Sequence, residues 1–385
     1  TGLILLFILV KRKRKPFSRS VFFLNVLFLV FIITDLTAFL AKPAKPLMER
    51  VMLPDQQVCD TCPKPDIYLL IADGYPGRET LDNYFGFDNR PFEKELRNRG
   101  FYIADSSRSN YNFTTYSMAS MLNMEYLEGI EGINSNKQEL AYCFSRIADS
   151  RVMSLLEKQD YEIVNHSIFD LNRQPSMAIP TFLPRKAEPI TEQTLIYRLE
   201  HEIGFHLATT LKLDFVLAYL KNHDLKNNIK LEQATRRLLN EKAAEKPRFV
   251  YTHLVMPHYP YYYDSLGRMR SAEGLTYENA SDKGSFVSYL KYSNKQFLGL
   301  IDHILQSSPR PPVILLMSDH GFREFTDGAY NPLQFVNFNA VLLPGRDYHS
   351  FYPGMSNVNQ FRALFNTLFR SKYPLLADST RLIVD

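Results

Sequence analysis

Two polar clusters in this chain of 385 residues directly follow apolar segments. Asp73 comes after Asp66–Ala72 (DIYLLIA), and Asp319-His320 comes after Val313–Met317 (VILLM). Both segments have the composition of buried strands, so each cluster is expected at the end of a strand. Carboxylate oxygens and an imidazole nitrogen are suitable ligands for Zn²⁺ or Mn²⁺. Either cluster alone would fit an ordinary turn, but their matching placement favours a metal site.

Residues 109–120 (SNYNFTTYSMAS) are rich in hydroxyl groups and lead into a predicted helix, Tyr116–Asn123. The start of a helix carries unpaired N–H groups and partial positive charge, which favour an alkoxide or a bound phosphate. A hydroxyl at this point beside a metal, such as that of Thr114, would be an activated nucleophile. Taken alone, the segment favours a simpler interpretation, in which Thr114 or Thr115 caps the helix.

The segment at residues 253–260 (HLVMPHYP) ends a predicted strand and enters a tyrosine-rich loop. His258 lies between prolines, which hold it rigidly, as a phosphate contact or an acid–base group requires. A purely structural histidine fits the segment equally well. Arg323 could bind a phosphoryl oxygen through a bidentate contact. The alternative for Arg323 is a surface ion pair with Glu324 or Asp327.

Two other motifs resemble functional sites but lack the required context. His201 and His206 (HEIGFH) are five residues apart, whereas a zinc-protease helix needs four. Cys59 and Cys62 form a C-x-x-C pair, but prolines and a strand follow it instead of the helix of a thioredoxin-like motif. A zinc knuckle would need a second pair. Outside the cytoplasm a local disulfide is expected, with Cys143 buried and alone.

The N-terminal part has the pattern of a membrane protein. Residues 1–10 are apolar and are interpreted as the end of a truncated transmembrane helix. Residues 11–20 carry six cations and no acid, and residues 21–41 form an apolar run long enough to span a bilayer. By the positive-inside rule, the basic loop is cytoplasmic and everything after residue 41 is outside. The net charge of +4 is due to this loop, so no basic surface for nucleic acid is expected.

We interpret residues 42–65, which contain the C-x-x-C pair, as a linker. Residues 66–385 are interpreted as one extracytoplasmic domain. Strand-like and helix-like segments alternate in this domain, which predicts an α/β fold with a mostly parallel sheet and helices on both faces. Ligands bind such sheets beyond the carboxyl ends of the strands. The predicted strands are Asp66–Ala72, Gly100–Ala104, Tyr161–Asn165, Arg248–Val255, Val313–Met317 and Phe338–Leu343. The predicted helices are Pro91–Arg99, Tyr116–Asn123, Arg151–Gln159, about Glu192–Glu245, Phe286–Gln306 and Asn359–Arg370.

Four motifs, in one order, carry a resemblance to a known family: IADG (71–74), SNYNFTTYSMASMLN (109–123), HLVMPHYP (253–260) and SDHGFR (318–323). Over roughly residues 66–370 the chain resembles the sulfatase-like branch of the alkaline phosphatase superfamily. More narrowly, it is similar to the membrane-anchored branch that includes lipoteichoic acid synthases and phosphoethanolamine transferases. The resemblance implies an alkaline-phosphatase-like fold, a mixed and mostly parallel sheet, preceded here by a transmembrane helix.

The resemblance also implies roles for individual residues. Thr114 matches the nucleophile, and the implied metal ligands are Asp73, Thr114, Asp319 and His320. Asp73 departs from the named transferases, which have Glu at its position. The implied contact to the substrate phosphate is His258, which is also a catalytic candidate. His253 and Arg323 are further candidates for substrate binding. The implied reaction is ping-pong: Thr114 attacks a phosphodiester, and an acceptor alcohol or water then takes the group.

The sequence also departs from parts of the superfamily. It lacks the Cys-x-Pro-x-Arg motif that sulfatases modify to formylglycine, which disfavours sulfate ester hydrolysis. It also lacks an Asp-x-x-x-His motif for a second metal, which favours one divalent ion. We expect Zn²⁺ or Mn²⁺, with Ca²⁺ or Mg²⁺ as alternatives.

These observations predict a phosphotransferase in the inner (plasma) membrane with a periplasmic catalytic domain. It would move a phosphoethanolamine- or phosphoglycerol-like group to an envelope lipid or glycan. The alternatives are a phosphodiesterase, phosphatase or sulfatase-like hydrolase using the same site, and a non-enzymatic envelope scaffold. The oligomeric state is left open.

Overall fold

The computed structural model describes residues 22–23, 25–33, 59–130, 137–178, 223–241, 244–275, 279–325 and 331–384. The chain forms two compact units, Thr1–Arg50 and Val51–Asp385. In the first unit, residues 22–23 and 25–33 are helical, and their large apolar side chains are exposed. None of the helices among the described residues is long and apolar enough to cross a membrane. The rest of the span predicted at 21–41, and the predicted segments 1–10 and 11–20, lie outside the described residues.

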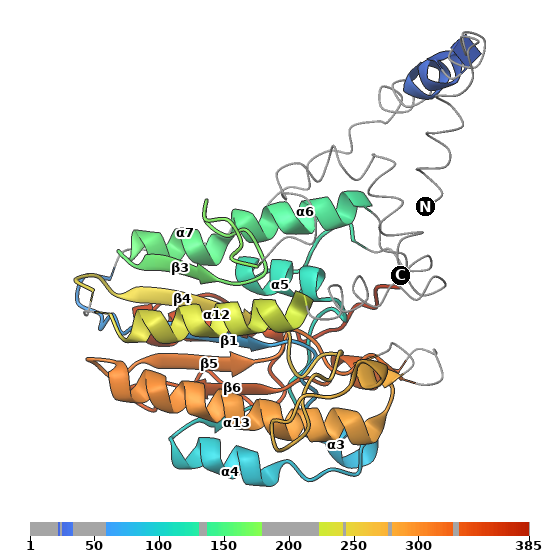
Figure 1. The fold of residues 1–385 in the computed structure, drawn as a ribbon. Helices are drawn as coiled ribbons and strands as arrows, with labels where there is room; N and C mark the ends of the chain where they lie inside the picture. Colours follow the sequence, from blue (N-terminus) through green and yellow to red (C-terminus); the bar gives the residue numbers. More distant parts are fainter. Residues whose placement is uncertain are drawn as a thin grey trace. The chain divides into compact units, whose positions relative to one another are not determined.

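The second unit is built on a single mixed sheet of six strands in the order β2-β6-β5-β1-β4-β3 (Figure 1). β1 runs parallel to its neighbours β5 and β4, and β3 runs parallel to β4. β6 is antiparallel to both β5 and β2. These strands confirm the predicted ones and the mostly parallel sheet. Their bounds are β1 Ile67–Ala72, β2 Tyr102–Ile103, β3 Glu162–His166, β4 Arg248–Leu254, β5 Val313–Met317 and β6 Asn339–Leu342.

Most of the predicted helices are also present. The prediction for about Glu192–Glu245 is confirmed for α12, whereas residues 192–222, with the His201–His206 motif, lie outside the described residues. Two helices, α3 and α6, were not predicted. In the described part of the second unit, the helices of at least six residues are α3 Arg78–Asn83, α4 Arg90–Asn98, α5 Thr114–Asn123, α6 Lys137–Ala148, α7 Arg151–Lys158, α12 His223–Leu239, α13 Lys283–Ser307 and α14 Gln360–Phe369.

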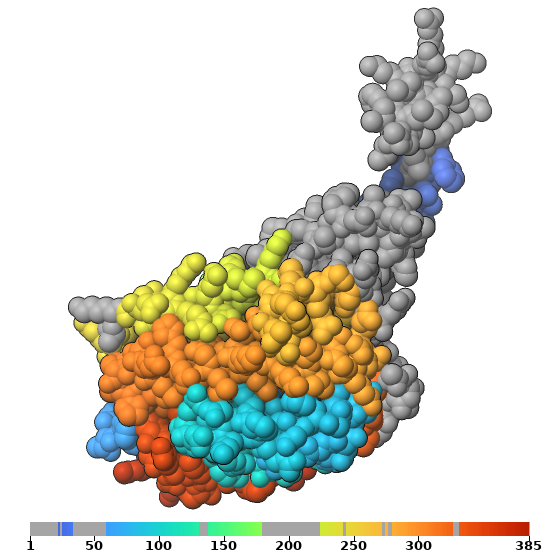
Figure 2. Space-filling view, turned by 60° about the horizontal axis from the view of Figure 1, so that its bottom comes forward, coloured from blue at the N-terminus to red at the C-terminus, as the bar shows by residue number. Residues whose placement is uncertain are grey.

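Helices cover both faces of the sheet, as predicted. On one face, apolar residues of α4, α12 and α13 join one core cluster with alternate residues of β1, namely Tyr68, Leu70 and Ala72. Figure 2 shows α13 and α4 side by side on the surface, where Arg99 and Asp302 form an ion pair of 2.7 Å. On the other face α14 packs on β4 and contacts α5, which in turn contacts α6 and α7.

β1 lies at the centre of the fold because its sequence allows burial on both sides. All six residues of IYLLIA are buried, as is typical of a parallel strand covered by helices on each face. β4 and β5 have the same character, with six of seven and five of five residues buried. These three apolar strands therefore pair with one another and bring their carboxyl ends to one edge of the sheet.

The state of the three cysteines confirms the prediction of one local disulfide and one buried, free thiol. Cys59 and Cys62 form a disulfide. The backbone N–H of Cys59 donates to the side-chain oxygen of Gln159, which attaches the bridge to the end of α7. Cys143 is free and buried in α6, and burial raises the pKa of its thiol to about 12.

A buried histidine makes the stability of this fold sensitive to pH. His166 ends β3, and its Nδ1 lies 2.9 Å from Oγ1 of Thr235 in α12. Burial lowers the pKa of His166 from 6.5 to about 4, because the charged imidazolium loses its hydration in the folded protein. The unfolded chain therefore binds a proton in a pH range where the folded protein does not.

We predict that His166→Asn, which can keep a hydrogen bond to Thr235, removes part of the pH dependence of unfolding. In the wild type, the free energy of unfolding should fall as pH drops from 6.5 towards 4. The whole effect amounts to about 3 kcal/mol. Urea titrations of both proteins across this range should show a smaller fall for the variant. Parallel curves for the two proteins would show that His166 is not the group responsible.

Candidate active site

Three neighbouring strands supply the centre of the site. Asp73 directly follows β1, Asp319 comes two residues after β5, and His253 lies near the end of β4, where it pairs with Ile71. Because these strands are parallel and adjacent, the three side chains meet at the carboxyl edge of the sheet. Asp73 is 5% exposed, and both Asp319 and His253 are 0% exposed.

The donor atoms of these residues fit a metal ion. One ligand atom from each of Asp73, His253 and Asp319 lies within 4.8 Å of the others. Oδ1 of Asp73, Nε2 of His253 and Oδ2 of Asp319 are buried without a hydrogen-bond partner among the described residues. Buried polar atoms without partners are costly, and a divalent cation would satisfy all three at once. Two carboxylate oxygens and one imidazole nitrogen are ligand atoms that bind Zn²⁺ and Mn²⁺.

The charges around Asp73 keep it ionised, as a metal ligand must be. Burial raises the pKa of its carboxyl, but the histidines around it outweigh this effect, and the pKa falls below its ordinary value. His258 makes the largest of these opposing contributions, followed by His253 and His320. Nε2 of His253 and Nε2 of His320 each lie 3.5 Å from an oxygen of Asp73.

His320 presents a lone pair to the centre of the site. Its Nδ1 lies 2.7 Å from the carbonyl oxygen of Gly321, and a carbonyl can only accept, so Nδ1 carries the proton. Nε2 is then the basic atom, 3.5 Å from carboxylate oxygens of both Asp73 and Asp319. Burial lowers the pKa of His320, although Asp319 opposes this, and the ring is held neutral. A neutral imidazole fixed by a carbonyl is the usual state of a metal ligand.

His253 has a comparable arrangement. Its Nδ1 lies 2.8 Å from the hydroxyl of Tyr251, two residues earlier on the same face of β4. Burial raises the pKa of Tyr251 well above its ordinary value, and the charges of Asp319 and Asp73 add to this, so the phenol stays protonated. The sequence placed His253 among the substrate contacts, whereas its geometry also suits a metal ligand.

Thr114 is the first residue of α5, and it faces the same centre. Its Oγ1 lies 3.2 Å from Nε2 of His320. The N-cap position belongs to Phe113, whose side chain makes no capping hydrogen bond. The interpretation of Thr114 or Thr115 as the helix cap is therefore wrong. The hydroxyl of Thr114 instead lies at the positive end of the helix dipole, where an alkoxide is stabilised.

His258 borders the site beside Asp73 and His320. Its backbone N–H donates to the carbonyl of Asp73, and its Nδ1 donates to the carbonyl of Tyr259 at 2.6 Å. Its Nε2 lies 3.4 Å from Oε1 of Glu324. Burial lowers the pKa of His258, but Asp73 and Glu324 more than compensate, and the pKa is raised. A protonated His258 would offer its Nε2 proton to an anionic oxygen.

Arg323 is held close to Thr114 by an aromatic ring. Its guanidinium carbon lies 4.6 Å from the ring centroid of Phe113, the residue before Thr114. Nε of Arg323 is buried and has no hydrogen-bond partner in the part of the chain that the structure describes. Of the two acids considered as ion-pair partners, Glu324 contacts His258, and Asp327 lies outside the described residues. With respect to the described residues, the guanidinium is therefore available for a phosphoryl oxygen.

Two glycines allow the backbone to approach this closely. Gly74 has a φ of +65°, and a Cβ there would lie 3.3 Å from Cδ2 of His258 and 3.5 Å from Cε1 of His320. A Cβ on Gly321 would lie 2.5 Å from the carbonyl oxygen of Val336. Any larger residue at Gly74 or Gly321 would therefore displace the chain that carries a candidate ligand.

All seven residues selected from the sequence lie around this one centre. Sequence reasoning did not select Tyr251, Phe113 or Glu324 for their observed roles. Tyr251 could have been found from its i−2 position to His253 on a strand, because such residues share a face. Phe113 and Glu324 act on residues distant in sequence, and no local pattern indicates this.

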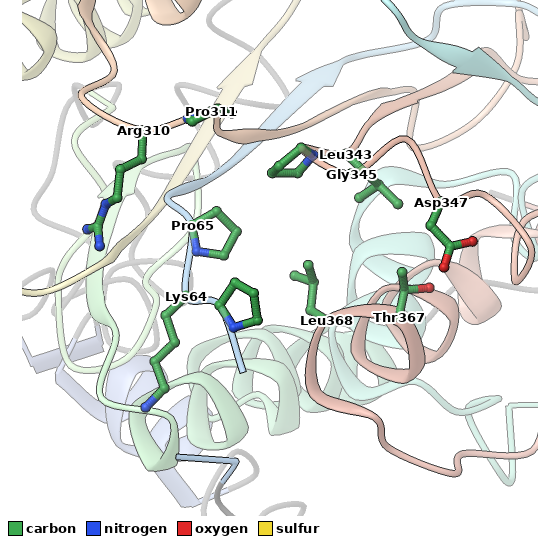
Figure 3. A pocket seen from close by; sticks show the side chains of 11 residues that line it. Lys64, Pro65, Arg310, Pro311, Leu343, Gly345, Asp347, Thr367 and Leu368 are labelled. Atoms are coloured by element: carbon green, nitrogen blue, oxygen red, sulfur yellow. The ribbon is translucent and has the colours of Figure 1, made fainter. Parts of the chain in front are cut away.

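A separate pocket of about 450 Å³ lies at the opposite end of the sheet (Figure 3). Its lining includes Pro63 and Pro65, which precede β1, and Arg310 and Pro311, which precede β5. The lining is mainly proline and leucine, and none of the candidate catalytic or metal-binding residues contributes to it. The pocket is therefore distinct from the site described above.

No protein-family model and no curated protein sequence matches this chain. Solved structures do match it. The C-terminal periplasmic domain of EcEptC from Escherichia coli, in complex with Zn, has a TM-score of 0.51 at 12% identity, covering 87% of this chain and 94% of that one. The integral membrane protein lipooligosaccharide phosphoethanolamine transferase A (EptA) from Neisseria meningitidis has a TM-score of 0.50 at 11% identity, covering 81% of this chain and 56% of that one. These likenesses confirm the alkaline-phosphatase-like fold that the order of the motifs implied.

Proposed function

We propose that this protein is a metal-dependent phosphotransferase that works through a phosphorylated Thr114. It would transfer a phospho-head group, of phosphoethanolamine or phosphoglycerol type, from a membrane lipid to an envelope lipid or glycan. One observation carries the proposal: a threonine hydroxyl at a helix N-terminus lies 3.2 Å from Nε2 of a buried histidine, beside two buried carboxylates with unpaired oxygens.

The metal-binding part of the proposal rests on Asp73, Asp319, His320, His253 and Thr114. These residues would hold one divalent cation, Zn²⁺ or Mn²⁺. The cation would stabilise the alkoxide of Thr114 and offset charge on the phosphoryl group. Mutual repulsion between the two buried carboxylates gives the site a strong preference for positive charge.

The remaining chemistry belongs to the side chains of the chain itself. In the first half-reaction Oγ1 of Thr114, already deprotonated to the alkoxide, bonds to phosphorus, and the ester bond between phosphorus and the donor oxygen breaks. Protonated His258 is placed to give its Nε2 proton to the departing oxygen, and the guanidinium of Arg323 to bind a phosphoryl oxygen. In the second half the acceptor hydroxyl gives its proton to His258 as its oxygen bonds to phosphorus, and the bond to Thr114 breaks to return the Thr114 alkoxide.

Sequence and structure both support a location outside the cytoplasm. The basic segment 11–20 followed by the apolar run 21–41 favours an anchor with the catalytic unit on the outer side. A disulfide between Cys59 and Cys62 is typical of an oxidising compartment. An anchor would hold the site near lipid-borne donors, which favours a transferase over a hydrolase that acts on soluble esters.

We predict that Asp319→Asn weakens Zn²⁺ binding by at least about 100-fold, since it removes a ligand charge with little change in volume. The wild type should gain thermal stability when Zn²⁺ is added, and the variant should gain almost none. Competition with a chromogenic chelator and thermal unfolding would measure both effects. Asp347→Asn, at an exposed carboxylate by the distant pocket, is the matched control and should behave as wild type. Equal Zn²⁺ affinity in all three proteins would rule out this metal site.

We predict that Thr114→Ala lowers turnover by at least about 10³-fold but leaves metal bound. Thr115→Ala removes the adjacent hydroxyl from the same helix and should keep turnover within about threefold. After incubation with mixed lipids and Zn²⁺ or Mn²⁺, peptide mass mapping should find an adduct on Thr114, whose mass identifies the transferred group. Full activity in Thr114→Ala would refute the nucleophile assignment. Release of free phosphate or phosphomonoester without a transferred product would favour the hydrolase alternative.

A further inference from the structure

The main-chain carbonyl of Asp319 is held by two buried side chains from distant parts of the chain. The hydroxyl of Ser117, in α5, donates to this oxygen at 2.6 Å. Nδ2 of Asn357 donates to the same oxygen at 3.0 Å and also lies 3.3 Å from Oγ of Ser117. Both side chains are 1% exposed. Two donors therefore fix the backbone of a proposed metal ligand.

Ser117 also belongs to the helix of the proposed nucleophile. It lies three residues after Thr114, so both side chains lie on the same face of α5, about one turn apart. The bond from Ser117 to Asp319 thus joins the nucleophile helix directly to the metal-binding loop. Serine has a short side chain with one χ angle, so this link permits little variation in the distance between helix and loop.

Asn357 is itself fixed by further buried polar groups. Its Oδ1 accepts from Nδ2 of Asn337 at 2.9 Å, and the same Nδ2 donates to the carbonyl of Ser318 at 2.7 Å. Oδ1 of Asn337 accepts from the hydroxyl of Ser107 at 3.0 Å. This network fixes the amide orientation of Asn357, because only its Nδ2 can face the carbonyls of Ser318 and Asp319.

The carboxylate of Asp319 is oriented from its other side. Oδ1 accepts from the backbone N–H of Gly74 at 3.1 Å and lies 3.4 Å from Oγ of Ser318. Oδ2 remains without a partner among the described residues and faces Nε2 of His320 at 3.5 Å. Rotation of the Asp319 backbone would therefore move the one oxygen that is free for a metal.

We propose that Ser117 and Asn357 are positioning residues that set the distance between the hydroxyl of Thr114 and the metal-binding oxygen of Asp319. Neither touches the reacting atoms. Both act through the carbonyl of Asp319, and Ser117 also acts through α5. The inference rests on the proposed function, since it assigns these residues to the Thr114 reaction. Misplacement of a reacting group by about 1 Å costs roughly 100-fold in rate, so loss of this link should be seen in turnover.

The chain provides a matched control for each residue. Ser120 lies in the same helix, is 0% exposed, and donates to a backbone carbonyl at 2.6 Å, but its acceptor is Glu125, away from the site. Asn359 lies two residues from Asn357, is 0% exposed, and donates to the carbonyl of Leu376 at 2.8 Å. Alanine at Ser120 or Asn359 therefore removes a similar buried hydrogen bond without releasing Asp319.

The experiment compares Ser117→Ala with Ser120→Ala, and Asn357→Ala with Asn359→Ala, in the full chain. Three quantities are measured: thermal stability, the rate of adduct formation on Thr114 in a single turnover, and the visible spectrum of bound Co²⁺. The two members of each pair should lose similar stability. Ser117→Ala and Asn357→Ala should slow adduct formation by about 10- to 100-fold and should alter the Co²⁺ spectrum. Their controls should keep both the rate and the spectrum of wild type.

The outcomes separate this inference from the proposed function. If the wild type forms the adduct and each test variant matches its control in rate and spectrum, the positioning role is wrong while the proposed function stands. If the wild type neither binds Co²⁺ nor forms an adduct, the proposed function fails first. Should Ser117→Ala not fold, the comparison of Asn357→Ala with Asn359→Ala decides the question.

Discussion

The structure depends on the close approach of two buried carboxylates, those of Asp73 and Asp319. Removing two like charges from water and bringing them together is strongly unfavourable unless positive charge offsets it. His258 makes the largest contribution to offsetting this cost at Asp73, whose pKa is lowered in spite of its burial. The unpaired oxygens that remain, one on each carboxylate, are the reason to expect a cation as well. Parallel pairing of β1 with β5 imposes this geometry, because it places both strand ends at one edge.

The imidazoles around this pair divide into two electrostatic states. His320 is neutral because its burial outweighs the attraction of the nearby acids, and its Nδ1 is committed to a carbonyl. The pKa of His258 is raised, because the charges of Asp73 and Glu324 together outweigh the effect of its burial. A neutral histidine can ligate a metal, whereas a charged one can bind an anion or release a proton. Opposite tendencies in two neighbouring histidines are what a site needs when it binds both a cation and a phosphoryl group.

Much of the fold could be predicted from the sequence because the strands are nearly continuous apolar runs. β1 and β5 are recognisable from residues 67–72 and 313–317 alone. The polar residues that directly follow these parallel strands must then lie at the carboxyl edge of the sheet. α3 was missed because its six residues, RETLDN, contain one large apolar residue and show no period. The placement of Thr114 needed the motif order as well, since its segment alone favoured helix capping. The antiparallel direction of β6 follows from its pairing with β5, which no local pattern encodes.

The two residues proposed as positioning residues, Ser117 and Asn357, share one physical property: they act through the backbone of another residue. A metal ligand has a characteristic side chain and a characteristic place at a strand end, so its type and position carry information. Asn357 instead acts by donating to the carbonyls of Ser318 and Asp319, and any residue has a carbonyl. The type of the acceptor residue therefore gives no indication of the contact. Buried amides and hydroxyls near a site must satisfy their donors somewhere, and following those donors to their acceptors is how such residues are recognised.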